Sequence, residues 1–215
     1  MVDPASSKKK ESNRTAMCVV GVDANYNKFL LDGVCHRLSL SERWDHLKKL
    51  RAKWKRAPGV REVKVGYERY GAQSDIEHFK EMMRIEGSNF PIYELNWVGG
   101  GGSQSKKDRI QRLEPDLKDG SFFWPYPTDK KMLTSLQMDV SDRKQEFLVS
   151  KKIMCKDENG MAYNLTKWVK DNEYNLFPTI HPDFLDALSR IYDIDATPPI
   201  SRSYRKLEPE AEAAY

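Results

Sequence analysis

Short apolar runs alternate along the chain with stretches in which apolar residues recur every three or four positions. Runs of this length are typical of buried strands, and the spaced stretches are typical of amphipathic helices. Alternation of the two over 215 residues indicates one α/β domain. The predicted strands cover residues 1–4, where Pro4 ends the run, then 15–22, 28–34, 60–67 and 92–97.

The lengths of the connections predict how these strands pair. The first three runs lie too close together for helical crossovers, and the polar turn 23–27 has hairpin length, so these strands are expected to be antiparallel. A helical stretch separates the last two runs, which predicts a parallel pair with a right-handed crossover. The expected fold is therefore a mixed five-stranded sheet, three strands antiparallel and then two parallel, flanked by helices.

Four helices are predicted from apolar stripes. The first begins at a serine cap, Ser39 or Ser41, carries Leu40, Trp44 and Leu47 on one face and ends before the Pro58-Gly59 pair. The others cover residues 74–85, residues 106–117 after a run of four glycines, and a last segment that begins near Pro182.

Residues 121–178 have a weaker pattern and are interpreted as an insertion in a domain that spans residues 1–195. They contain a predicted hairpin, in which residues 145–155 pair with 160–165 around the turn 157–160. The prolines and mixed charges of residues 196–215 predict a disordered tail.

Composition excludes several classes of protein. No apolar stretch is long enough to cross a bilayer, and no secretory signal pattern is present, which predicts a cytosolic protein. The three cysteines form no CxxC pair, so neither a disulfide framework nor a zinc cluster is indicated. The net charge is +4, and the basic residues occur in clusters that permit contact with a polyanion or simply form a solvated face.

Acidic residues lie where several predicted elements end. Asp3 follows the first strand, Glu68 follows the fourth, and Asp183 and Asp186 open the last helix. If the first and fourth strands are neighbours in the sheet and the last helix packs at their ends, these carboxylates converge. Each also has an ordinary explanation: a turn aspartate, a surface ion pair, or a negative charge at a helix N-terminus.

A convergent group of carboxylates needs cations, because like charges repel strongly in a partly dry site. Oxygen ligands without His or Cys suit Mg²⁺ or Mn²⁺. Two such ions activate a water and stabilise the leaving oxygen of a phosphodiester. The acids therefore indicate metal-dependent phosphodiester hydrolysis.

The order of several motifs resembles the C-terminal nuclease domain of the large terminase subunit of tailed phages, which has an RNase H-like fold. The resemblance covers roughly residues 1–120 and 179–194. The motifs are Asp3-Pro4-Ala5, Asn13 to Met17, VVGVDANYNKFLLDG (19–33), VKVGYERYG (63–71), SKKDRIQRLEP (105–115) and HPDFLDALSRIYD (181–193).

The resemblance implies that Asp3, Glu68 and Asp183 hold two Mg²⁺ or Mn²⁺ ions. Pro182 replaces an acid that is common in the family, which leaves Asp186 as an alternative third ligand, and Asn13 replaces another acid. The implied activity is endonucleolytic cutting of concatemeric viral DNA in the host cytoplasm during genome packaging. Implied partners are double-stranded DNA, the terminase ATPase domain, the small terminase subunit and the portal; no Walker A motif is found here.

Basic residues on the predicted 106–117 helix are candidates for DNA contact. Lys106, Arg109 and Arg112 share a face that could follow a DNA backbone. The alternative is a solvent face on which these residues form salt bridges with Asp108 and Glu114. The further candidates are Lys107, Lys151 and Lys152. Two other functions stay open at this point: a different RNase H-like nuclease, such as a junction resolvase, and a non-catalytic DNA-binding or assembly module of the packaging machine.

Overall fold

The structure is a computed structural model of the chain. It describes residues 1–5, 14–69, 74–96, 103–125, 152–196 and 198. Most of the predicted tail and the larger part of the predicted insertion, including Lys151, lie outside these residues.

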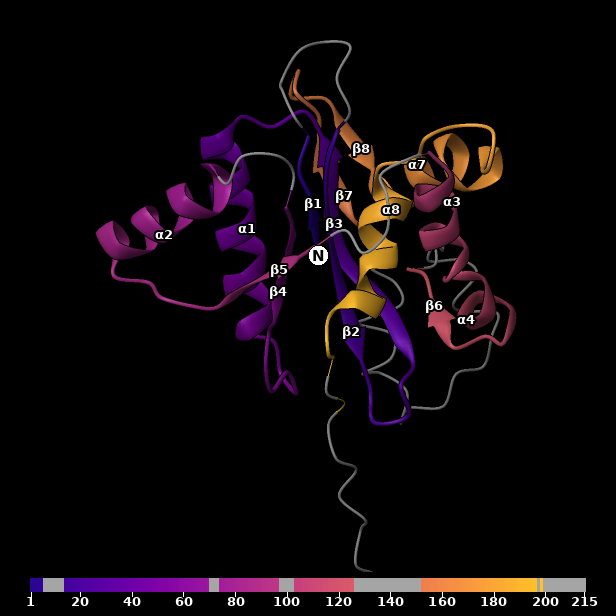
Figure 1. The fold of residues 1–215 in the computed structure, drawn as a ribbon, viewed down its shortest axis with the longest axis horizontal. Coiled ribbons are helices and arrows are strands. Elements are labelled where there is room, and N and C mark those ends of the chain that lie inside the picture. Colours follow the sequence, from indigo (N-terminus) through magenta and orange to yellow (C-terminus); the bar gives the residue numbers. More distant parts are fainter. Residues whose placement is uncertain (6–13, 70–73, 97–102, 126–151, 197, 199–215) are drawn as a thin grey trace, which may run out of the picture.

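A six-stranded mixed sheet forms the centre of the molecule, in the order β5-β4-β1-β2-β3-β6 (Figure 1). Its strands are β1 (Val2–Asp3), β2 (Thr15–Val22), β3 (Lys28–His36), β4 (Val65–Glu68), β5 (Ile92–Leu95) and β6 (Phe122–Phe123). β1, β2 and β3 are antiparallel, whereas β4 runs parallel to β1 and β5 parallel to β4. The predicted pairing is confirmed, and the mixed sheet is compatible with an RNase H-like architecture.

Helices cover both faces of the sheet (Figure 1). On one face lie α1 (Leu40–Lys55) and α2 (Ser74–Glu86). On the other lie α3 (Ser103–Gln111), α4 (Glu114–Lys118), α7 (Leu165–Asn172), the short 3-10 helix η2 (Tyr174–Leu176), α8 (Phe184–Ser189) and the 3-10 helix η3 (Arg190–Asp193). A separate hairpin pairs β7 (Met154–Lys156) with β8 (Ala162–Asn164).

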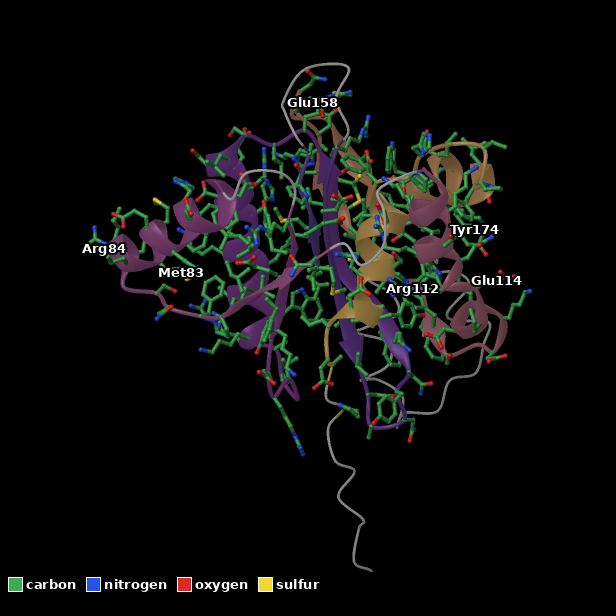
Figure 2. The ribbon with its side chains drawn as sticks, viewed as in Figure 1. Met83, Arg84, Arg112, Glu114, Glu158 and Tyr174 are labelled. Carbon is green, nitrogen blue, oxygen red and sulfur yellow. The ribbon has the colours of Figure 1, made fainter. Side chains whose placement is uncertain are left out.

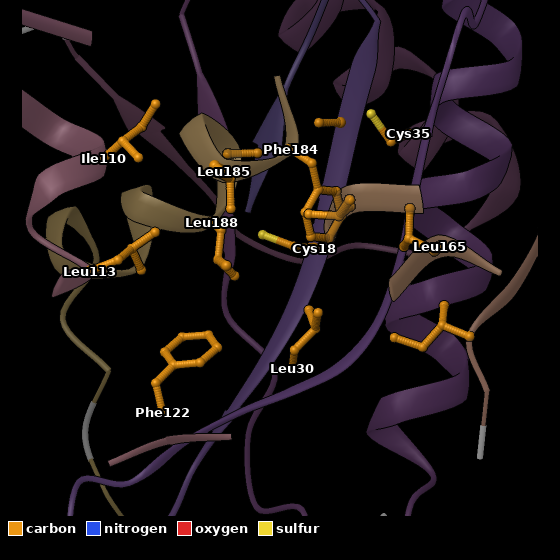
Figure 3. Close-up of a cluster of buried hydrophobic side chains, with 14 residues drawn as sticks. Cys18, Leu30, Cys35, Ile110, Leu113, Phe122, Leu165, Phe184, Leu185 and Leu188 are labelled. Atoms are coloured by element: carbon orange, nitrogen blue, oxygen red, sulfur yellow. The ribbon is translucent and has the colours of Figure 1, made fainter. Parts of the chain in front are cut away.

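Each face of the sheet has its own hydrophobic core. Under α1 and α2, Trp44 and Phe79 pack with Tyr67 of β4. On the opposite face the side chains of α8, including Phe184 and Leu188, pack on the sheet together with α3 and α7 (Figure 3). Ser39 caps α1, and its hydroxyl and the Glu42 carboxylate form a reciprocal capping box.

Two predictions about the elements were wrong. The sheet has a sixth strand, β6, which pairs in parallel with β3. The predicted 106–117 helix is interrupted between α3 and α4, because Arg112 and Leu113 adopt a turn ahead of Pro115. The described parts of the region interpreted as an insertion pack on the domain, and Phe122, Ile153, Leu165 and Val169 belong to its core.

The structure also describes the three cysteines and the lengths of the helices. All three cysteines are free thiols, and Cys18 and Cys35 are buried in the core. Within the described part of the chain, every helix is too short or too polar to cross a membrane.

Candidate metal centre

Three buried carboxylates meet where β1 and β4 end. Val2 lies opposite Tyr67 in the parallel pairing, so the next residues, Asp3 and Glu68, leave the sheet side by side. Asp186 joins them from the first turn of α8, which packs against β1 and β2. One carboxylate oxygen from each of the three residues lies within 4.8 Å of the others.

Asp183 lies beside this group and has different contacts. It is the N-cap residue of α8, and its Oδ2 accepts a hydrogen bond of 2.8 Å from the backbone N–H of Arg14. Its Oδ1 is 3.5 Å from Nζ of Lys106. Of the two residues left open as third ligand, the geometry therefore groups Asp186 with Asp3 and Glu68, and leaves Asp183 at the margin.

Two basic side chains of α3 point into the acidic group. The Arg109 guanidinium donates to both oxygens of Asp186, from Nη2 at 2.7 and 2.8 Å and from Nε at 3.0 Å to Oδ1. Nζ of Lys106 is 3.2 Å from Oδ2 of Asp186. In this structure the two residues, predicted to form a DNA-contacting face, are engaged with the carboxylates.

Arg190 is a third cation at the site, and it is buried. Its Nε lies 3.7 Å from Oε2 of Glu68, and its Nη1 forms an ion pair of 2.7 Å with Asp193. Arg109 also approaches Glu68, at 3.9 Å. Glu68 is only 1% exposed, so these charges interact in a region that water screens weakly.

The charges perturb one another's protonation. Burial, and then the nearby charges of Glu68 and Asp186, raise the pKa of Asp3 well above its usual value. For Lys106, burial acts to lower the pKa, but attraction to Asp186, Asp3 and Asp183 outweighs it, and the pKa is raised. Asp3 is therefore harder to ionise than an ordinary aspartate, whereas Lys106 keeps its positive charge more readily than an ordinary lysine.

Glu173 fixes the start of α8 and was not predicted. Its carboxylate accepts backbone hydrogen bonds from Asp183, Phe184 and Leu185, at 2.9 to 3.1 Å, and so pairs N–H groups that a helix start leaves without intrahelical partners. Burial raises the pKa of Glu173 to about 7. Nothing in the local sequence pointed to Glu173. Arg190 was also not predicted, although it stands three residues before Asp193, a spacing at which opposite charges on a helix pair.

The remaining predicted DNA contacts occupy varied positions. Arg112 lies between α3 and α8 (Figure 2), where it forms an ion pair of 2.7 Å with Asp193 and donates to the backbone oxygen of Ser189 at 3.2 Å. Lys107 is partly exposed and Lys152 is exposed. Their contact with DNA stays a prediction.

The donor set fits a hard divalent cation. Asp3, Glu68 and Asp186 offer carboxylate oxygens only, the ligands that Mg²⁺ and Mn²⁺ prefer, and the group lacks the nitrogen or sulfur ligands of typical zinc sites. After burial, the charges of Glu68 and Asp186 add to the rise in the pKa of Asp3, and a cation bound between the three carboxylates would offset their repulsion.

Comparisons with known proteins add no family to this picture. A scan against protein-family models finds no match to the chain, and a search of curated proteins finds no significant match.

Proposed function

We propose that the protein is a metal-dependent DNA endonuclease that cuts concatemeric viral DNA during genome packaging. The observation that carries the proposal is the convergence of Asp3, Glu68 and Asp186 at the ends of two adjacent parallel strands. The resemblance of the sequence motifs to the nuclease domain of a large terminase subunit supplies the substrate and the biological setting.

Asp3, Glu68 and Asp186 would hold Mg²⁺ or Mn²⁺, as a pair of ions in the proposed reaction, with Asp183 beside them. Bound there, the metal supplies Lewis-acid activation of water and stabilisation of the leaving oxygen. Lys106 and Arg109 hold Asp186 in place and bring positive charge to the position that a phosphodiester must approach.

Double-stranded DNA is the proposed substrate. Lys107, Arg112 and Lys152, with Lys151 outside the described residues, are proposed to contact its phosphates without reading sequence. The terminase ATPase domain, the small terminase subunit and the portal are the proposed protein partners, and the host cytoplasm is the proposed location.

The ion pairs of Lys106 and Arg109 favour a second candidate. In a non-catalytic DNA-binding or assembly module, these two cations would neutralise the acids permanently, and no metal would be needed. The two functions differ in one measurable property, the binding of a divalent ion by the acids.

A plasmid-nicking assay in Mn²⁺ tests the proposed reaction. Glu68→Gln keeps the shape of a buried side chain and removes its charge. We expect the nicking rate to fall by more than about 100-fold, because loss of a residue that only supports a metal ligand typically costs about 10- to 100-fold. Glu94→Gln is the matched control, because Glu94 is an exposed acid on the neighbouring strand β5. Equal nicking by wild type and Glu68→Gln would reject the assignment.

Calorimetry with Mn²⁺ separates the two candidate functions. Heat of binding that Glu68→Gln abolishes supports the nuclease, and its absence in the wild type supports the non-catalytic module. Cleavage of linear duplex is then compared with cleavage of four-way junctions. Preference for the duplex supports a packaging nuclease, and preference for the junction supports a junction resolvase.

A further inference from the structure

Arg14 directly precedes β2 and stands at the margin of the metal centre. Asp3 pairs with Ala16 of β2, so Arg14, two residues earlier, lies at the end of the strand pair where Asp3 leaves the sheet. The backbone N–H of Arg14 donates to Oδ2 of Asp183 at 2.8 Å. The residue is partly exposed. Its backbone is therefore held beside the acids, and its side chain is accessible to a ligand.

The Arg14 side chain packs on an aromatic platform. Its guanidinium carbon lies 4.6 Å from the centroid of the Trp168 ring of α7. Trp168 in turn contacts Tyr163 edge-on, with centroids 6.3 Å apart, and the Tyr163 hydroxyl donates to the backbone oxygen of Cys35 at 3.0 Å. A guanidinium that lies over a ring is attracted to the ring face and still has N–H groups free to donate. The platform thus holds the cation in place while leaving its donors available.

Arg14 differs from the other cations of the site in having no acidic partner. Within the described parts of the chain, its guanidinium forms no ion pair. Asp183 pairs with Lys106 instead, and Glu158 of the β7–β8 hairpin pairs with Arg37. Every other cation described at the site forms an ion pair with an acid: Lys106, Arg109, Arg112 and Arg190.

A phosphate group suits the free donors of Arg14. The planar guanidinium matches the oxygens of a phosphate and can donate to two of them at once. In the proposed reaction the scissile phosphate lies at the three acids, whereas the guanidinium lies over α7. The phosphate within its reach is therefore a neighbour of the scissile one.

We propose that Arg14 binds a DNA phosphate next to the one held at the metal centre, and so directs the substrate strand along α7. The identity of this ligand rests on the proposed nuclease function. A phosphate contact fixes the position of the duplex without reading its sequence. Trp168 supports the guanidinium and is a positioning residue.

The salt dependence of DNA binding counts phosphate contacts. Binding of a linear duplex to the full chain is followed by fluorescence anisotropy in metal-free buffer, so that the DNA stays uncut. Each contact contributes about 0.9 to the slope of log K against log salt. Arg14→Gln should reduce this slope by about 0.9, so that the ratio of wild-type to variant affinity grows about eightfold for each tenfold decrease in salt.

Two further variants separate the charge of Arg14 from its packing. Arg14→Lys keeps the charge and should keep the wild-type slope, with weaker binding because a lysine cannot donate as a planar fork. Arg84→Gln removes an exposed arginine of α2, on the opposite face of the sheet (Figure 2), and should also keep the slope. An equal loss of slope in Arg14→Lys and Arg14→Gln would assign Arg14 a packing role and overturn the proposal.

The failure of this proposal is distinguishable from the failure of the nuclease function. Nicking in Mn²⁺ that depends on Glu68, together with an unchanged slope in Arg14→Gln, would overturn the phosphate contact alone. A reduced slope in Arg14→Gln with no nicking by the wild type would keep the contact and overturn the nuclease. Absence of duplex binding by the wild type would overturn the contact as well.

Discussion

Lys106 and Arg109 show how far the role of a residue depends on its surroundings. Both belong to a polar helix whose sequence suggests a solvent face, yet their long side chains reach the carboxylates of α8. Ion pairs of this kind, shielded from water, interact more strongly than exposed pairs. The acidic group is therefore partly neutralised by the protein itself.

Removing the charge of Lys106 should strengthen metal binding. Two unit charges about 4 Å apart interact by about 4 kcal/mol at an effective dielectric constant of about 20, so Lys106→Met should bind Mn²⁺ at least about tenfold more tightly. Calorimetric titration measures this affinity. Lys107→Met removes the same charge from the next position, where no ion pair with the acids is formed, and should bind Mn²⁺ as the wild type does. Unchanged affinity in Lys106→Met would show that Lys106 does not compete with the ion.

His36 should make the fold sensitive to mild acid. It is 5% exposed, its ring packs edge-on against His46 with centroids 5.5 Å apart, and its Nδ1 has no hydrogen-bond partner among the described residues. Burial and then the proximity of His46 lower its pKa from 6.5. The unfolded state thus binds more protons as the pH falls below 6.5, and the free energy of unfolding decreases until the pH is below the folded-state pKa.

Urea unfolding at about pH 7.5 and about pH 5.5 measures this loss. His36→Phe keeps an aromatic ring without a titrating group, so its loss of stability between the two pH values should be smaller than in the wild type. His181→Gln, at an exposed position, should behave as the wild type. Identical pH dependence in His36→Phe would exclude His36 as the source.

At the scale of elements, α8 depends on contacts from distant parts of the chain. It is only six residues long, too short to be stable alone, and its start is fixed by Glu173 rather than by a cap of its own. Its apolar side chains pack on β2 and β3, and this packing directs Asp186 toward β1 and β4. The position of the third carboxylate thus follows from packing.

Gly33 in β3 lies where β2, α7 and α8 leave no room for a side chain. A Cβ added there would lie 2.6 Å from the backbone oxygen of Met17 and 3.0 Å from side-chain atoms of Leu165 and Phe184. Backbone cannot move aside as a side chain can, so Gly33→Ala should lower the free energy of unfolding by about 3 kcal/mol, measured by urea unfolding. In Gly21→Ala the close contact is the flexible end of Leu31, at 2.8 Å, and the loss should be clearly smaller. Equal losses would mean that the backbone around Gly33 moves aside as easily as the Leu31 side chain does.

At the scale of the whole molecule, metal binding should stabilise the fold, because β1, β4 and α8 meet only in the folded state. At a free Mn²⁺ concentration about 100 times Kd, the free energy of unfolding should rise by about 2.7 kcal/mol. Thermal unfolding with and without Mn²⁺ measures the effect. Asp186→Asn should remove it, whereas Asp171→Asn, at an exposed position on α7, should keep it. Stabilisation that persists in Asp186→Asn would place the ion elsewhere.

The sequence by itself determined the alternation of strands and helices, the antiparallel and then parallel pairing, and the acids at the ends of elements. These features follow from the local spacing of apolar residues and from the lengths of the connections between consecutive elements. Both can be read directly from neighbouring segments of the sequence. It missed β6, because a two-residue strand leaves no periodic signal, and α7, although Asn164 caps it and Leu165 and Val169 share its buried face.

Only the tertiary structure decided that Asp186 rather than Asp183 joins Asp3 and Glu68, that Lys106 and Arg109 point inward, and that Glu173 holds α8. Each of these depends on distances between residues far apart in the chain. Such distances are set by how α8 and α3 pack on the sheet, and both candidate acids stand near the same helix start in sequence. Periodicity places a side chain on a face of its own element, but the packing of elements determines which charges meet.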